Sequence, residues 1–86
     1  MSERKDADLI ADLLNAGRRI RDYLRGMSFR EFEKDLKTQD AVIRNLEVIG
    51  EAVKLLSEEF KRKHPEVPWK HMAGMRDVII HRYFGF

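Results

Sequence analysis

Residues 38–63 read TQDAVIRNLEVIGEAVKLLSEEFKRK, and this stretch decides the fold. Its apolar residues recur at alternating steps of four and three, the spacing that aligns side chains along one face of an α-helix. A second apolar stripe lies beside the first and widens the face enough to contact two neighbouring helices. The first stripe comprises Val42, Leu46, Ile49, Val53, Leu56 and Phe60, and the second Ala41, Val48, Ala52 and Leu55. The pattern predicts one central helix over 38–63, with helices packed on two sides.

Gly50 falls in the middle of this helix, where glycine costs about 1 kcal/mol relative to alanine. Glycine at such a position usually permits close approach of another backbone, although a tolerated defect is nearly as common. The basic run over 61–64 favours the negative end of the helix dipole, and Pro65 predicts the end of the helix. Pro68 suits the first position of a further helix, in which Trp69 follows.

Two helices are predicted before the central one. The first shows the same helical spacing of apolar residues and ends near Gly26, because glycine commonly terminates helices. Ser28 and Glu31 then form the pattern of a capping box, which begins a short second helix. The apolar residues are Leu9, Leu13, Ala16, Ile20, Tyr23 and Met27 in the first helix, and Phe29, Phe32 and Leu36 in the second. We expect the apolar edge of the short helix to lie across the longer helices.

The last segment completes an all-α fold. Met72, Met75, Val78 and Ile79 share one face, which predicts a helix running towards the end of the chain. With 86 residues, the chain is expected to form a single domain over 1–86, a small antiparallel helical bundle that buries only roughly 60% of its unfolded surface. So thin a core would gain from oligomerisation.

Composition excludes several classes of protein. Seventeen basic against fifteen acidic residues give a net charge of +2, too little for a protein that coats nucleic acid, so any contact with RNA should be local. The chain has no cysteine, which excludes disulfides and thiolate metal sites. It also lacks the apolar run of a signal peptide and the ~20 apolar residues of a membrane span. A soluble, cytoplasmic protein is therefore expected.

The candidate functional side chains lie close together near the end of the sequence and are Arg76, His81 and Tyr83. Arg76 carries a permanent positive charge, His81 exchanges protons near neutral pH, and Tyr83 carries a phenol. Together these groups fit a site that acts on a phosphodiester better than they fit a hydrophobic core. On a helix, Tyr83 lies nearly above Arg76, whereas His81 is rotated by about 140° from Arg76. Asp77 lies one turn before His81 and could orient the imidazole. Because Arg76 and His81 point in different directions, a compact site requires a second copy of the chain across a twofold axis.

A purely structural role fits the same spacing. Arginine and tyrosine often occur at the ends of helices, and a single histidine usually only completes a hydrogen bond. His64 and His71 invite a metal site with His81, but their separations lack the i, i+4 pair typical of zinc, so no metal site is predicted. An arginine row could guide RNA, although such a row is usually a solvated face. It comprises Arg18, Arg21 and Arg25, with Arg19 beside them.

Three stretches make the chain resemble HEPN-domain proteins and, within that superfamily, the HepT toxins of HepT–MntA toxin–antitoxin systems. They are QDAVIRNLEVIGEA at 39–52, VPW at 67–69, and the terminal MRD at 75–77 with HRYF at 81–84. The terminal stretch matches the superfamily pattern of an arginine, four to six residues, a histidine, any residue and a tyrosine. The central stretch is more particular to HepT.

The resemblance implies a helical bundle that forms a homodimer and works as a metal-independent endoribonuclease, without a cofactor. It implies that His81 is the general acid or base while the RNA 2′-hydroxyl attacks the adjacent phosphate, and that Arg76 stabilises the developing charge. Tyr83 would position the phosphate, and Asp77 would be a supporting residue. An MntA-like nucleotidyltransferase antitoxin would neutralise the toxin by attaching adenylate to Tyr83.

The chain departs from the HepT pattern in two places. Relatives continue past the motif into another helix, so the bundle is expected to lack the family's final helix and to expose apolar surface on its long helices. Asp77 stands where asparagine is common, and its charge, if buried, would pair with Arg76 and weaken phosphate binding. Two alternatives to the nuclease stay open. One is a noncatalytic helical dimer that binds nucleotide or presents Tyr83 to a nucleotidyltransferase, and the other is a purely structural subunit.

Overall fold

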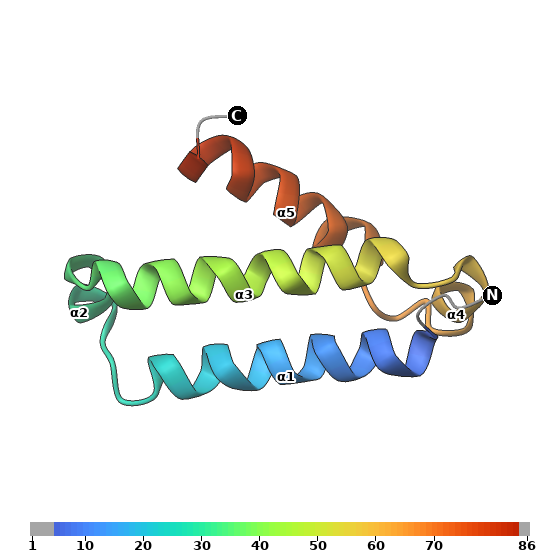
Figure 1. Cartoon of the computed structure of the whole chain (residues 1–86), viewed down its shortest axis with the longest axis horizontal. Coiled ribbons are helices and arrows are strands. Elements are labelled where there is room, and N and C mark those ends of the chain that lie inside the picture. Colours follow the sequence, from blue (N-terminus) through green and yellow to red (C-terminus); the bar gives the residue numbers. More distant parts are fainter. Residues whose placement is uncertain (1–4, 85–86) are drawn as a thin grey trace.

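The computed structural model describes residues 5–84, which form an all-α fold. Its helices are α1 (Asp6–Leu24), α2 (Phe29–Lys34), α3 (Leu36–Leu55), α4 (Glu58–Lys63) and α5 (Trp69–Phe84). The long helices α1 and α3 lie side by side and antiparallel, and α5 crosses α3 at an angle (Figure 1). The predicted small helical bundle is thus confirmed, with α3 as the element that touches both other long helices.

The core lies on α3, as the sequence predicts. Val53 is fully buried, and Ile49, Ala52 and Leu56 beside it are nearly so. Leu9 and Ala16 of α1 pack against them to form two adjoining clusters, and Trp69 at the start of α5 packs against both. Partly buried residues around these clusters include Ile10, Leu13, Ile20, Val48, Phe60, Trp69, Met72 and Ala73. Apolar burial along one helix therefore joins the three long helices.

The prediction of one helix over 38–63 is wrong at both ends. The helix α3 begins earlier, at Leu36, because the Asp35 carboxylate accepts a hydrogen bond from the Thr38 backbone N–H at 3.0 Å. It ends at Leu55, and after the extended Leu56 the Ser57 hydroxyl accepts from the Phe60 N–H and caps the separate helix α4. Serine is a preferred N-cap residue, so Ser57 was a signal for the break that the apolar periodicity concealed.

Other predictions about the first two helices have mixed outcomes. Gly26 adopts a positive φ of 73° just after α1, and the capping box of Ser28 and Glu31 is formed. The expected packing of the short helix's apolar edge is confirmed for Phe32, which is half-buried and lines a pocket with residues of α3 and α5. It is wrong for Phe29, which is 74% exposed, and for Leu36, which begins α3 instead and is 71% exposed. The end of α2 is also joined to α3 by the Gln39 amide, which donates to two α2 carbonyl oxygens.

Three further residues expected on apolar faces are exposed. Tyr23 lies near the end of α1, while Leu55 lines a pocket between α1 and α3. Val78 is exposed because the face that α5 turns towards α3 is centred on Met72, Arg76 and the buried Ile79. None of the described helices has the length and apolar content needed to cross a membrane.

A pH-dependent contact joins the start of α1 to the start of α4. The Asp6 carboxylate accepts hydrogen bonds from the Ser57 hydroxyl at 2.6 Å and from its backbone N–H at 3.0 Å. These bonds hold the pKa of the Asp6 carboxyl below its ordinary value of 3.8. A depressed folded-state pKa adds stability above about pH 3.8, and this contribution is lost as the pH falls through the folded-state pKa.

We therefore expect Asp6→Asn to lower the melting temperature at pH 7, and the difference from wild type to shrink at a pH below 3.8. Thermal unfolding followed by circular dichroism at both pH values measures this. Asp8→Asn is the matched control, since it removes a carboxylate from the same helical turn but leaves the Ser57 bonds intact. A difference of the same size at both pH values would contradict the assignment.

Candidate functional site on α5

Gly50 fixes where α5 meets α3. A Cβ atom at this position would lie 2.6 Å from Arg76 Cβ and 3.4 Å from the Met72 carbonyl oxygen. Real Cβ atoms do not approach so closely, so only glycine permits this contact between the helices. The predicted close approach is confirmed, and it brings Arg76 of the terminal motif onto α3.

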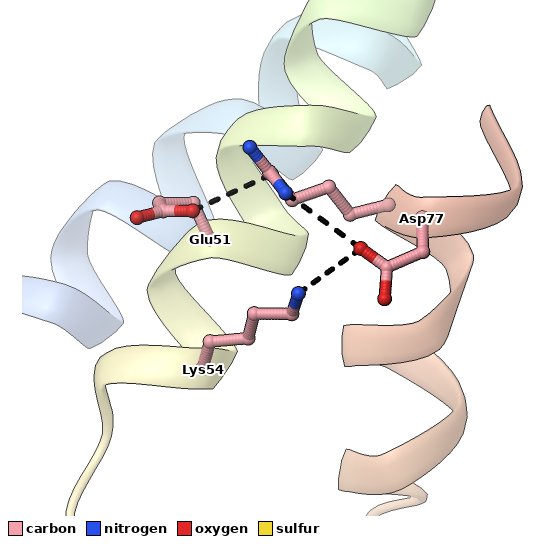
Figure 2. A network of polar contacts seen from close by, with 4 residues as sticks. Glu51, Lys54 and Asp77 are labelled. Atoms are coloured by element: carbon pink, nitrogen blue, oxygen red, sulfur yellow. Dashed lines mark hydrogen bonds and ion pairs between the residues drawn. The ribbon is translucent and has the colours of Figure 1, made fainter. Parts of the chain in front are cut away.

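The Arg76 guanidinium lies in a network of four charged residues shared by α3 and α5, of which Figure 2 labels Glu51, Lys54 and Asp77. Its Nε is 3.4 Å from Glu51 Oε1, and its Nη1 is 3.7 Å from Asp77 Oδ1. The same Asp77 oxygen is 3.0 Å from Lys54 Nζ. Asp77 is exposed rather than buried, yet its charge does contact Arg76. We call these residues the Arg76 network.

Arg76 also lines a pocket of about 400 Å³ between α1, α3 and α5. The Arg76 side chain is 31% exposed, so the guanidinium is accessible from this pocket while carboxylates hold it. The other lining residues are Asp12, Arg44, Glu47 and Glu51, which are charged, and Leu9, Val48, Ala52 and Leu55, which are apolar. The pocket thus places two arginines among carboxylates over an apolar floor.

His81 lies apart from Arg76 within one chain. It is exposed on the last part of α5, about 7.5 Å further along the helix axis. Between Asp77 and His81, both within the described 5–84, no hydrogen bond or ion pair is formed, and the Asp77 carboxylate is directed to Lys54 and Arg76 instead. Tyr83 belongs to α5 by its backbone, but its side chain lies outside the described part of the molecule.

The sequence interpretation missed Glu51 and Lys54. A signal for Lys54 was present, because a residue four positions after a glycine at a helix crossing lies on the same side of the helix, whereas Glu51 is the charged residue next to that glycine. Once Gly50 predicts a close approach, Glu51 and Lys54 become candidates to meet the charges on the approaching helix. The partner helix, however, could be identified only from the tertiary structure.

The remaining histidines have structural surroundings. The His64 ring packs 4.7 Å from the Phe60 ring, and its carbonyl oxygen accepts a hydrogen bond from the Trp69 indole at 3.0 Å. His71 is exposed near the start of α5. Within residues 5–84, no three histidine, aspartate or glutamate side chains are grouped so that they could hold a metal ion. The arginine row of α1 is exposed to solvent.

The fold and the site define a helical bundle that carries an arginine–histidine–tyrosine motif on its last described helix. Over residues 13–86 the chain matches the family described as Ribonuclease HepT-like, and it belongs to this family.

Three relatives illustrate the similarity. The chain is 60% identical over 74 residues to "Putative RNase MJ0127" of Methanocaldococcus jannaschii, covering 86% of this chain and 61% of that protein. It is 49% identical over 83 residues to "Probable ribonuclease HepT" of Thermococcus cleftensis, covering 96% of this chain and 76% of the relative. "Putative RNase TTE0752" of Caldanaerobacter subterraneus subsp. tengcongensis is 56% identical over 62 residues, which cover 72% of this chain and 55% of that protein. No solved structure matches the chain.

Proposed function

We propose that this chain is a metal-independent endoribonuclease and the toxin component of a toxin–antitoxin system. The observation that carries the proposal is an accessible Arg76 at the edge of a pocket, with an exposed His81 further along the same helix. Two relatives are named putative RNases and a third is named a probable ribonuclease HepT, which supports the same reaction.

In the proposed reaction, the 2′-hydroxyl of RNA attacks the adjacent phosphorus. The O2′–P bond forms, the P–O5′ bond breaks, and the products are a 2′,3′-cyclic phosphate and a 5′-hydroxyl. His81 accepts the proton of the 2′-hydroxyl or donates one to the leaving oxygen. Arg76 stabilises the additional negative charge on the phosphate oxygens, which is largest in the transition state.

The site is proposed to be shared by two copies of the chain. Within one chain Arg76 is directed towards α3 while His81 is exposed on the last part of α5, so a second α5 is needed to complete the pair. Large apolar residues that are exposed in the single chain give a partner copy surface to cover. They include Phe29, Leu36 and Val78.

Tyr83 is proposed to be the control point. Helical spacing puts Tyr83 on the same side of α5 as Arg76, so adenylate attached to its phenol would add bulk and negative charge on the arginine side of the proposed site. An MntA-like nucleotidyltransferase antitoxin is the proposed partner: the phenol oxygen, losing its proton, forms a bond to the α-phosphorus of ATP, and pyrophosphate leaves.

The direct test is cleavage of a single-stranded RNA in EDTA, with DNA of the same sequence alongside. We expect cleavage of the RNA to a 2′,3′-cyclic phosphate and none of the DNA, because DNA lacks the attacking hydroxyl. Mass spectrometry of the products identifies the cyclic phosphate. Cleavage of both nucleic acids, or cleavage only with added divalent metal, would contradict the mechanism.

A second candidate is a noncatalytic dimer that presents Tyr83 to the nucleotidyltransferase. It is favoured by the two carboxylates already close to the Arg76 guanidinium, since they compete with a phosphate for that charge. Incubation with the nucleotidyltransferase and ATP, followed by intact mass measurement, separates the two. Adenylate addition to a chain that never cuts RNA supports this module, whereas both activities together support the regulated toxin.

A further inference from the structure

A second pocket, of about 570 Å³, lies where α4 and the start of α5 meet the end of α3. We call it the Trp69 pocket. Its wall combines the Trp69 indole and the His71 imidazole with four cations and one carboxylate. The cations are Lys54, Lys61, Arg62 and Lys70, and the carboxylate is Glu58. This charge is concentrated there because α4 ends in three basic residues and α5 begins directly after the following turn.

The four cations differ in how far they are already neutralised. Lys54 Nζ is 3.0 Å from Asp77 and Lys61 Nζ is 3.5 Å from Glu58. Arg62 and Lys70 are exposed, and neither forms an ion pair with a carboxylate in the part of the chain that the structure describes. Two positive charges at the Trp69 pocket are therefore available to an anion without breaking a described ion pair.

The aromatic wall is held in place. Trp69 donates its indole N–H to the His64 carbonyl oxygen at 3.0 Å, and its ring meets the edge of Phe60 at a centroid distance of 6.0 Å. Both core clusters pack against the same side chain. Because the indole is already ordered, a ligand ring that contacts its accessible part loses little additional entropy to side-chain ordering.

A partly accessible aromatic ring beside unpaired cations is the combination that binds single-stranded nucleic acid, where bases contact the ring and phosphates meet the charges. The Trp69 pocket also adjoins the Arg76 network, because Lys54 both lines the pocket and binds Asp77, which contacts Arg76. A strand with one phosphate at Arg76 could therefore place a neighbouring nucleotide in the Trp69 pocket.

We propose that the Trp69 pocket binds a nucleotide of single-stranded RNA next to the linkage that is cut. Arg62 and Lys70 contact its phosphates, and its base lies against Trp69. The position of this nucleotide beside the cleaved linkage rests on the proposed ribonuclease function, whereas its binding does not.

The test uses the full chain and a short single-stranded RNA whose 2′-hydroxyls are methylated, so that it binds without being cut. Trp69 is the one tryptophan among the 86 residues, so the intrinsic indole fluorescence reports on this pocket. We expect the oligonucleotide to quench this fluorescence in the wild type. In Arg62→Glu/Lys70→Glu the affinity should fall by about tenfold or more, and the slope of log K against log salt should decrease by about 1.4, which corresponds to two lost phosphate contacts on a single strand.

Arg30→Glu/Lys34→Glu is the matched control. It changes the charge equally, but on α2, at the opposite end of the molecule from α4 (Figure 1). The control should keep the wild-type affinity, and circular dichroism should show both variants folded. AMP at the same concentration should bind far more weakly than the oligonucleotide, because it has a single phosphate.

Three results would overturn the proposal. These are an unquenched Trp69 at saturating oligonucleotide, equal affinities of the wild type and Arg62→Glu/Lys70→Glu, and binding of AMP as tight as that of the oligonucleotide. Failure of the nuclease proposal would look different. In that case the quenching and its loss in Arg62→Glu/Lys70→Glu persist, but unmodified RNA is never cut.

Discussion

Replacing His81 with glutamine should reduce the rate of RNA cleavage by about 10²- to 10⁴-fold, the usual contribution of a positioned general acid or base. Glutamine keeps much of the size of histidine and can form hydrogen bonds, but it cannot accept and return a proton near neutral pH. His81 is exposed, so the substitution should leave the melting temperature nearly unchanged. The measurement is single-turnover cleavage of a labelled RNA in EDTA.

His64→Gln is the matched control for this prediction. It removes the imidazole that packs on Phe60 but keeps the backbone N–H that bonds to the Lys61 carbonyl oxygen at the end of α4, so we expect a small loss of stability and an undiminished cleavage rate. If His81→Gln cleaves RNA as fast as His64→Gln, the histidine of the motif has no chemical role.

Mixing two inactive variants tests whether the site is shared between chains. If the twofold axis relates two equivalent sites, each built from Arg76 of one chain and His81 of the other, a dimer of Arg76→Ala with His81→Ala keeps one intact site of the two. Random exchange should therefore restore about a quarter of the wild-type activity. A mixture as inactive as its components would place both residues of each site on the same chain.

Gly50→Ala should destabilise the fold by up to about 2 kcal/mol, despite the higher helix propensity of alanine. The new methyl group would lie 2.6 Å from Arg76 Cβ, an atom that cannot move without its helix. Overpacking of this kind costs typically 1–3 kcal/mol, which exceeds the gain of about 1 kcal/mol from propensity. Because α5 must shift, Arg76 moves relative to Glu51, and RNA cleavage should fall as well.

Gly17→Ala supplies the control, because nothing lies within 4 Å of a Cβ built at Gly17 in the middle of α1. It should stabilise the protein by up to about 1 kcal/mol. In thermal unfolding the two variants should shift in opposite directions, by roughly 4–8 °C for each kcal/mol in a domain of this size. Equal upward shifts would mean that α5 does not pack on Gly50.

The sequence predicted most of the helices and misplaced their boundaries for a definable reason. Apolar periodicity reports which face of a segment is buried, and on this basis Val53, Ile49 and Ile79 were correctly assigned to the core. The apolar pattern continues across a break between two helices when both helices pack on the same core, as α3 and α4 do here. Leu56 and Phe60 therefore concealed the cap at Ser57.

The candidate site was predictable only in part. The positions of Arg76, His81 and Tyr83 on one helix followed from spacing, as did the separation of Arg76 from His81. The pairing expected between Asp77 and His81 did not form, because Lys54 and Arg76 hold the Asp77 carboxylate. Helix geometry predicts only which residues are neighbours within one helix, whereas the Asp77 carboxylate also forms an ion pair with Lys54 of α3.

The sequence by itself determined the helical class, the apolar face of the central helix and the motif that α5 carries, since these depend on interactions between residues near one another in the chain. Only the tertiary structure decided that Glu51 and Lys54 meet Arg76 and Asp77, and that α4 and α5 together form the Trp69 pocket. Such contacts depend on the position and angle at which helices cross. Here a single missing side chain at Gly50 sets that crossing.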